Sequence, residues 1–351
     1  MNSKFITLTA TAVVTFMVAA AEKKPSPKAG LATPGILIPL SALVPEAEIA
    51  TDSPAVGMQF NDAALIATAT AVQRIDARTN KPVEPPVRVK IENGCGGMIS
   101  AFNALWVPAC GNRTLTKIDT GGGGRRSEAA KPAATAPRMT LAASIATSKV
   151  TASSAVAAND DSIWLLSDAK TTLQRIDPRE NAIAGELRLP PHCAAILFAD
   201  SSIWAACPTE NRVIRIDPKT SLVSQRIEVA AEPIALAFGE DSLWVLGRKE
   251  GKLSRVDPKT NKVTATVDLG IPGASTGALA FGEGSLWASL PGFPVIRVSP
   301  AAGKEKVLQE FHGEGGGGLI TFGLGSVWVA SPGTNSVKRY DPKRIVATLA
   351  E

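Results

Sequence analysis

A Trp-centred motif recurs along the chain and constrains its fold more than any other feature. Each copy places Trp after an aliphatic residue and a polar or small pair, as in DSLW and GSVW. The last five copies are 40, 40, 43 and 41 residues apart, whereas the first gap is 58 residues. A period of about 40 to 45 residues with β-type alternation is typical of a propeller, in which each repeat forms one blade. The copies are centred on Trp106, Trp164, Trp204, Trp244, Trp287 and Trp328.

A second signature, Arg-x-Asp or Lys-x-Asp, raises the number of repeats to seven. It ends thirteen residues after most of the Trp, and its sixth copy degenerates to RVS at Ser299. One copy, RID at Asp76, lies upstream of the first Trp, with Leu65 or Ala63 near the place of the missing Trp. We expect the Asp to begin a turn and the Arg to lie across the blade face towards an acidic partner, so we interpret the motif as architectural. The other intact copies end at Asp119, Asp177, Asp217, Asp257 and Asp341.

Residues 233–270 show how one repeat is expected to fold. PIALAF, LWVLG, KLSRVD and KVTATVDL have the patterns of four strands, and turn sequences such as DPKTN separate them. Four antiparallel strands make one blade, and blades must stack to bury both faces. The chain is therefore predicted to be an all-β, seven-bladed β-propeller of four-stranded antiparallel blades, after an N-terminal signal peptide. Trp and the Phe six residues before it should fill the space between blades. These Phe are Phe198, Phe238, Phe281 and Phe322.

The N-terminus has the pattern of an export signal. Residues 1–21 combine Lys4, an apolar stretch and the A-x-A pattern Ala19–Ala21, which predicts a cleaved signal peptide. The alternative, a transmembrane anchor, would use an apolar run of about 17 residues, at the lower limit for spanning a bilayer. Residues 22–34 are rich in Pro and Lys and are predicted to be a flexible leader, and 35–351 a single propeller. We therefore expect a periplasmic or secreted protein without a transmembrane segment after cleavage.

Three further segments depart from the repeat. Residues 121–138 are of low complexity, account for the long first gap and are predicted to be a mobile loop in blade 2. Residues 36–50 precede the first blade, and residues 344–350 have the pattern of a short outer strand. We expect one or both terminal segments to close the ring in the last blade, because closure removes exposed strand edges.

The repeat register pairs the four cysteines. Cys95 and Cys193 each lie eleven residues before a Trp, whereas Cys110 and Cys207 lie four and three residues after one. The two cysteines within one repeat therefore face each other across the first hairpin of a blade, where opposed residues come within disulfide range. We predict the disulfides Cys95–Cys110 and Cys193–Cys207, which an oxidising compartment permits. A zinc site would instead need thiols from two blades that are not neighbours.

The charge distribution restricts the class of partner. The formal net charge is +5, and the basic residues are dispersed through the repeats without a basic stripe. Nucleic-acid binding is not expected from such a pattern. Attraction to anionic polymers of the cell envelope is compatible with it. We expect a monomer whose partner is an unidentified protein, polymer or small molecule of the envelope.

The repeat strings GEGSLW and DPKTNKV resemble those of YVTN-type propellers and the virginiamycin B lyase-like repeat group, over about residues 55–345. For the lyase itself, the resemblance implies elimination at the ester of a cyclic depsipeptide by a His base, with Mg²⁺ held by acidic residues at the propeller mouth. This sequence departs from that pattern. Pro190 stands where a Glu is implied two residues before His192, and Glu310-Phe311-His312 lies too far upstream of Trp328. The residue three positions after each Trp is never acidic.

No complete catalytic set is recognisable, so our leading hypothesis is a non-enzymatic binding protein without a cofactor or metal. Its ligand would bind at the mouth of the central channel, where the inner strands end. The alternative is a metal-dependent lyase or hydrolase that uses Mg²⁺ and His192 or His312 with Glu310 or Glu314. The glycine runs 121–124 and 315–318 lack the Lys-Ser/Thr of a phosphate loop and are expected to be flexible turns. The candidate mouth residues are Asn93, His192, Glu232, Ser275 and Glu314.

Overall fold

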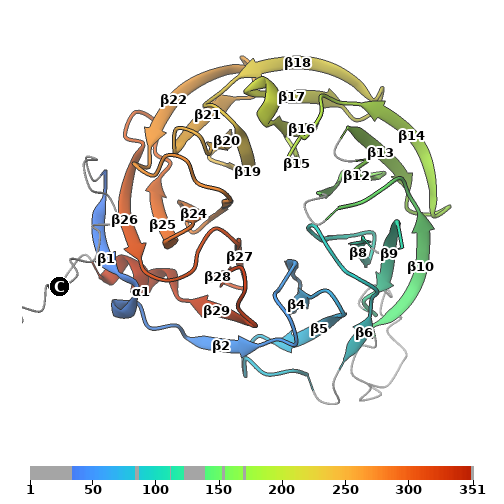
Figure 1. Cartoon of the computed structure of the whole chain (residues 1–351), viewed down its shortest axis with the longest axis horizontal. Coiled ribbons are helices and arrows are strands. Elements are labelled where there is room, and N and C mark those ends of the chain that lie inside the picture. The colour runs from blue at the N-terminus through green and yellow to red at the C-terminus, as the bar shows by residue number, and fades with distance from the viewer. Residues whose placement is uncertain are drawn as a thin grey trace, which may run out of the picture.

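Seven β-sheets are arranged around a central axis like the blades of a propeller (Figure 1). The computed structural model describes residues 34–83, 87–110, 112–121, 139–151, 155–168 and 171–348. The predicted all-β, seven-bladed fold of four-stranded blades is confirmed. The predicted signal peptide, residues 22–33 of the leader and residues 122–138 of the insertion lie outside the described residues. Within the described ranges, no helix is long and apolar enough to cross a membrane.

Blades 1 to 4 follow the repeats in chain order, and each runs from the inner strand outwards. Blade 1 comprises β3 (Gly57–Phe60), β4 (Ala63–Ala67), β5 (Ala71–Asp76) and β6 (Arg88–Lys90). Blade 2 comprises β7 (Ile99–Ala101), β8 (Ala104–Ala109), β9 (Thr114–Asp119) and β10 (Thr140–Ala146). Blade 3 comprises β11 (Val156–Ala158), β12 (Ile163–Ser167), β13 (Thr172–Asp177) and β14 (Ala182–Arg188). Blade 4 comprises β15 (Ala195–Ala199), β16 (Ser202–Cys207), β17 (Arg212–Asp217) and β18 (Leu222–Glu228), with the 3₁₀ turn η2 (Pro208–Glu210).

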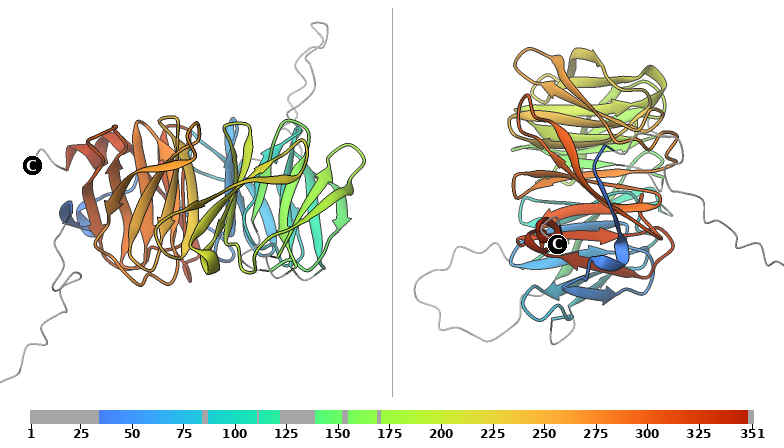
Figure 2. Two further views of the ribbon diagram at one scale, coloured as in Figure 1. Left: turned by 90° about the horizontal axis from the view of Figure 1, so that it is seen from above. Right: turned by 90° about the vertical axis from the view of Figure 1, so that its left-hand side faces the viewer.

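Blades 5 to 7 complete the ring. Blade 5 comprises β19 (Pro233–Gly239), β20 (Ser242–Gly247), β21 (Lys252–Asp257) and β22 (Lys262–Asp268). Blade 6 comprises β23 (Ala278–Gly282), β24 (Ser285–Leu290), β25 (Phe293–Ser299) and β26 (Lys306–His312). Blade 7 takes β27 (Leu319–Gly323), β28 (Ser326–Ala330) and β29 (Ser336–Tyr340) from the C-terminal part of the chain. Seen edge-on, the strands of the blades form a thick disc (Figure 2).

The N-terminal segment closes the ring over two blades. Strand β2 (Ala47–Ala50) pairs antiparallel with β29 and supplies the outer strand of blade 7. Strand β1 (Ile36–Pro39) pairs in parallel with β26 and adds a fifth strand to blade 6, and the 3₁₀ turn η1 (Leu40–Ala42) follows it. Because these strands come from the opposite end of the sequence, they hold the last two blades to the first part of the chain (Figure 1). The expected closure by residues 36–50 is confirmed.

The C-terminal segment is a helix, so the prediction of an outer strand at residues 344–350 is wrong. Helix α1 (Pro342–Ala347) begins after Asp341, whose side chain accepts a hydrogen bond from the backbone N–H of Lys343. Proline in the first helical turn costs no hydrogen bond and presets the backbone. The outer position of blade 7 is already filled by β2, and Ile345 is fully buried instead against the core between blades 6 and 7.

Aromatic rings fill the space between blades, as expected. All six Trp are buried. A Cβ atom at Gly239 would lie 2.2 Å from the ring of Phe281 in the next blade, and one at Gly282 would lie 2.0 Å from the ring of Phe322. The series continues across the closure with Phe60, which packs against Gly323 and lies 5.3 Å from the Trp328 ring between centroids. Glycine lets these three rings pack directly on the backbone of the neighbouring blade.

Substitution of Gly239 by Ala should destabilise the ring. The added methyl group has to displace the Phe281 ring, and overpacking of a core usually costs about 1–3 kcal/mol. Gly185→Ala in β14 is the matched control, because a Cβ atom there meets nothing within 4 Å. Urea unfolding should show the loss for Gly239→Ala and an unchanged or slightly higher stability for Gly185→Ala. Equal stability of the two variants would contradict the packing role.

The basic residue of the Arg-x-Asp motif contacts polar and aromatic side chains of its own blade, which fits the architectural interpretation of the motif. In blade 4 the Nε of Arg215 donates a hydrogen bond of 2.8 Å to Ser202 Oγ, and its guanidinium lies 4.9 Å from the Trp204 ring centroid. The same side chain forms an ion pair of 3.0 Å with Asp200. Arg175, Arg255 and Arg339 repeat the contacts with Ser and Trp.

Basic side chains of this motif also join neighbouring blades. The guanidinium of Arg215 donates to the carbonyl of Pro258 and to Asn261 Oδ1 in the turn of blade 5. Lys117 and Arg339 reach the corresponding turns of blades 3 and 1. The sixth repeat has lost this turn sequence, and there Arg255 instead pairs with Glu305 at 2.6 Å. A basic side chain therefore still contacts the next blade where the turn sequence of that blade is degenerate.

The turn aspartates should make the protein sensitive to acid. Backbone N–H groups two or three residues ahead hold the pKa of Asp177, Asp217 and Asp257 below the usual 3.8. Since the folded-state pKa is depressed, the stabilisation is complete above the unfolded value and is lost as pH falls through the folded value. The melting temperature should therefore decrease as the pH is lowered below about 4.

Replacement of all three aspartates by Asn keeps the hydrogen-bond acceptor but removes the titrating group, so it should reduce this decrease in melting temperature. Glu228→Gln serves as the control, and an unchanged slope in the triple variant would contradict the assignment.

Candidate functional site

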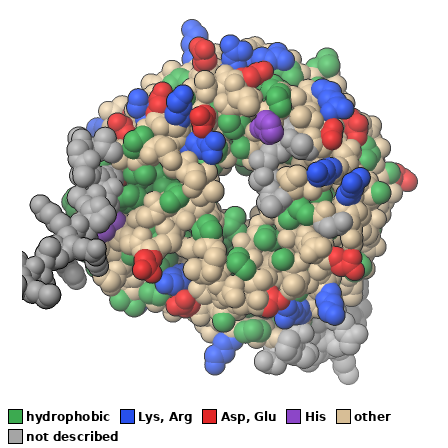
Figure 3. Space-filling model, in the orientation of Figure 1, with side chains coloured by type: hydrophobic (Ala, Val, Ile, Leu, Met, Phe, Trp, Pro, Cys, Tyr) green, Lys and Arg blue, Asp and Glu red, His purple; other side chains and the backbone are tan. Residues whose placement is uncertain are grey.

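A cavity of about 1040 Å³ occupies one end of the central channel. The space-filling view shows the opening at the centre of the ring (Figure 3). Two kinds of segment line it: the connections that enter each blade and the loops that follow the second strands. This volume is at the upper end of the range of about 300–1,000 Å³ for small-molecule sites. The repeat therefore places a single shared cavity where the inner strands meet.

One position of the repeat lines the cavity in several blades. The residue ten positions before Trp lines the cavity in each blade for which the structure describes it and a Trp is present. Four of these residues are Gly or Ala and one is Ile, and an added Cβ atom at Gly277 or Gly318 would meet neighbouring protein atoms. Each inner strand is paired on one side only. The cavity wall therefore offers backbone donors and acceptors as well as apolar surface. The residues at this position are Gly96, Ala194, Ile234, Gly277 and Gly318.

The structure places the candidate mouth residues in two groups. His192, Glu232 and Ser275 line the cavity, in the connections that enter blades 4, 5 and 6. Asn93 and Glu314 are exposed loop residues that are not among those lining it. The first group is brought together on one side of the mouth, whereas the second is not.

The residues of the alternative lyase hypothesis are separated. Glu310 and His312 lie in β26 of blade 6, directly beside β1, where His312 pairs with Pro39. They do not line the channel cavity, which His192 does. Across the described ranges, no group of three or more His, Cys, Asp or Glu side chains is arranged to hold a metal ion. The structure therefore does not bring the two histidines into one site.

Arg248 is the functional candidate that sequence reasoning missed. It lines the cavity, and its Nε donates a hydrogen bond of 2.8 Å to Glu232 Oε2. Its Nη1 donates a second bond of 3.1 Å to the carbonyl of Ser275. The repeat register offered a signal, because Arg248 is the only basic residue found four positions after a Trp. The other residues at this position are Cys110, Asp168, Pro208, Pro291 and Pro332.

The glycine run 315–318 is a packed turn rather than the expected flexible one. Gly315, Gly316 and Gly317 have positive φ angles, which L side chains rarely adopt. A Cβ atom at Gly316 would lie 2.1 Å from the carbonyl oxygen of Leu290. The N–H groups of Gly316 and Gly317 donate to the hydroxyl groups of Ser331 and Ser289. This run forms part of the cavity wall between blades 6 and 7.

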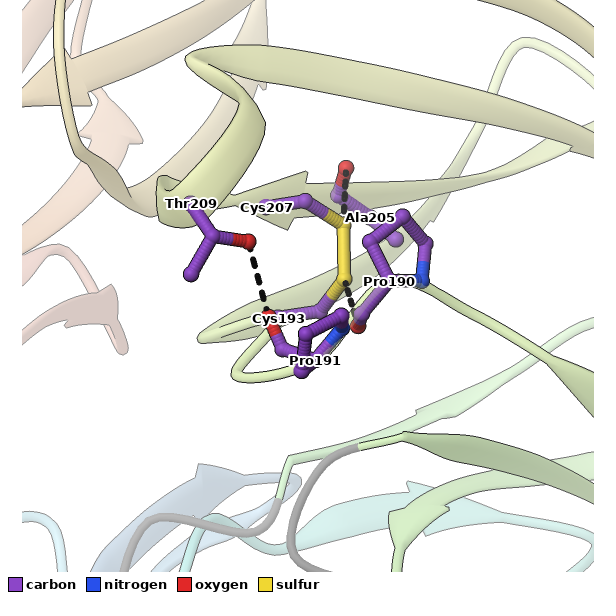
Figure 4. Close-up of a disulfide and its surroundings, with 6 residues drawn as sticks. All are labelled: Pro190, Pro191, Cys193, Ala205, Cys207 and Thr209. Atoms are coloured by element: carbon purple, nitrogen blue, oxygen red, sulfur yellow. Dashed lines mark hydrogen bonds between the residues drawn. A yellow bond between two sulfur atoms is a disulfide. The ribbon is translucent and has the colours of Figure 1, made fainter.

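Both predicted disulfides are present, and both lie next to the cavity. Cys95 pairs with Cys110, and Cys193 pairs with Cys207. His192 and Ala194, on either side of Cys193, line the cavity. The hydroxyl group of Thr209 donates a hydrogen bond of 2.9 Å to the carbonyl of Pro191 and further ties the segment to the loop after β16 (Figure 4). The disulfides thus hold two segments of the mouth in place.

Comparison with known proteins supports the fold alone. No protein-family profile matches the chain, and no curated protein sequence is detectably similar to it. Among solved structures, U3-55K is similar, with a TM-score of 0.65 and 10% identity over 85% of this chain and all of that chain. BamB from Moraxella catarrhalis has a TM-score of 0.59 and 11% identity over 85% and 99%. A chain of the mitotic checkpoint complex has a TM-score of 0.62 and 13% identity over 94% and 98%.

Proposed function

We propose that this protein is an exported, monomeric binding protein that takes a ligand or partner at the mouth of its central channel, without catalysis. The cavity of about 1040 Å³ carries the proposal, because it combines an apolar, small-residue wall with a polar rim at Arg248, Glu232 and His192. Concave sites of this kind, with a few fixed polar groups, are the usual form of ligand pockets.

Two further observations support the proposal. The two disulfides suit an oxidising compartment such as the periplasm or the exterior. One of the similar solved structures belongs to a multiprotein complex, the mitotic checkpoint complex, so the fold is used for assembly in that case. The likeness is one of fold, and function has to be argued from the site. The resemblance of the repeats to YVTN-type propellers is also compatible with a binding role.

The proposal is tested by blocking the cavity. Gly97 lines it, and a Cβ atom at Gly97 meets nothing within 4 Å, so Gly97→Leu should enter the cavity without disturbing the ring. Gly185→Leu in β14 is the matched control. A photo-crosslinking amino acid at Thr276, which also lines the cavity, should capture an envelope component. Capture should be lost with Gly97→Leu and kept with Gly185→Leu.

Two results would overturn the proposal. One is capture from Leu222, an exposed residue on the outer strand of blade 4, together with no capture from Thr276. The other is turnover of a streptogramin B in the presence of Mg²⁺ that is abolished by His192→Ala or His312→Ala. That result would establish the lyase alternative instead.

A further inference from the structure

The cavity has one charged wall and one uncharged wall. Arg248 and Glu232 belong to blade 5 and the connection that enters it, and His192 lies in the connection that enters blade 4. The opposite wall, from blade 7 to blade 2, is lined by Pro, Gly, Ala, Val, Leu and Ser among its described residues. A ligand that matches both walls has an apolar body and a charged or polar end.

The guanidinium group of Arg248 is fixed in an orientation that allows it to bind an anionic group. Its Nε and Nη1 bonds, to Glu232 and to the Ser275 carbonyl, fix the plane of the guanidinium. A guanidinium has five N–H donors, and within the described residues two of them are used in these bonds. The fork geometry of the free donors suits a carboxylate, which accepts two parallel hydrogen bonds. Because the guanidinium is fixed before binding, little side-chain entropy is lost when a carboxylate binds.

The walls of the channel favour a peptide as the body of the ligand. The inner strands β15, β19, β23 and β27 are each at the end of their sheet, so one backbone edge of each faces the channel. The cavity lining includes Ile234, Ala278 and Leu319, which lie in β19, β23 and β27, so the cavity reaches three of these edges. A peptide backbone can pair with them, whereas an acyl chain would leave them without partners at a cost. A cavity of about 1040 Å³ also has room for several residues.

We infer that the mouth binds the C-terminal end of an apolar peptide segment, with the terminal carboxylate on Arg248 and the apolar side chains against the uncharged wall. The inference rests on the proposed function and names its ligand class. Glu232 competes with the carboxylate for the same guanidinium and thereby limits affinity. Recognition of a free C-terminus by fixed donors is a known mode of peptide binding.

The test compares the probe acetyl-Gly-Ala-Ala-Val-Leu as the free acid and as the C-terminal amide, by isothermal titration calorimetry on the full mature protein. The acid should bind about tenfold more tightly than the amide, as expected for a hydrogen bond to a charged group. Arg248→Gln should abolish this difference. Glu232→Gln should increase the affinity for the acid, because it removes the competing carboxylate.

Asp168→Asn provides the matched control. Asp168 occupies in blade 3 the place that Arg248 occupies in blade 5, and it forms an exposed ion pair with Arg188 outside the cavity lining. The Asp168→Asn substitution should leave the affinities for the peptide acid and for the peptide amide unchanged. Equal binding of acid and amide to the wild-type protein would overturn the inference, as would laurate binding more tightly than the peptide acid. If crosslinking from Thr276 were retained in that case, the proposed function would stand and only the ligand class would be rejected. If the preference for the acid and the crosslinking were both absent, the ligand class and the proposed function would both be rejected.

Discussion

Deletion of residues 34–50 should open the ring and remove most of the stability of the protein. This segment supplies β1 and β2, and it buries Ile38, Leu43 and Ile49. Burial of each such side chain contributes about 1.5–3 kcal/mol, so the loss should be about 5 kcal/mol or more. Typical domains have only about 5–15 kcal/mol in total. The deletion also exposes the outer edges of β26 and β29 to pairing with other chains. Thermal melting followed by circular dichroism should show a lower, broader transition and aggregation.

A peptide of residues 34–50 added in trans separates closure from general damage. If the segment acts by pairing with β26 and β29, the peptide should restore the melting transition in a concentration-dependent way, because binding to the native state stabilises it. The same peptide with Ile49→Asp should fail, since Ile49 is buried. The peptide with Val44→Ala should succeed, since Val44 is 64% exposed. A deleted protein that melts like the full chain would show that the ring does not depend on this closure.

Removal of the Cys193–Cys207 disulfide is the second large effect that we expect. The bond closes a loop with a sequence separation of 14 residues, and its two cysteines are fully buried. The chain-entropy account assigns about 3 kcal/mol to a loop of this size. The double variant Cys193→Ala, Cys207→Ala should therefore unfold at a lower urea concentration, with its free energy of unfolding reduced by about 3 kcal/mol.

A comparison of the variant with the wild-type protein, both under reducing conditions, separates the packing of sulfur from the cross-link. Neither protein then has a disulfide, and the wild-type protein keeps the thiols of Cys193 and Cys207. The variant lacking Cys95 and Cys110 should lose a similar amount, because that separation is 15 residues. The Cys193 variant should also weaken peptide binding, since His192 and Ala194 beside it line the cavity. A loss of less than about 1 kcal/mol would mean that the hydrogen bonds of the hairpin suffice without the cross-link.

The register of the Trp motif accounts for what was predictable about the site. Counting from Trp located both disulfides, because residues at fixed offsets on two adjacent strands face each other. It also located His192, Glu232 and Ser275 on the connections that enter the blades. Arg248 was missed because its loop varies between repeats, and a lone Arg in a variable loop is usually solvated. Its contacts with Glu232 and Ser275 depend on how two connections and one loop approach each other.

The sequence by itself determined the number of blades, the strand order within a blade, the aromatic packing and the cysteine pairing. These follow from local periodicity and from contacts within one repeat or between neighbouring repeats, which recur at fixed offsets. Only the tertiary structure decided how the ring closes, that residues 342–347 form a helix, and which side chains meet at the mouth. Closure pairs residues almost 300 positions apart, such as Glu48 and Ser336. The cavity is assembled from all seven blades, and no repeat contains the information for such contacts.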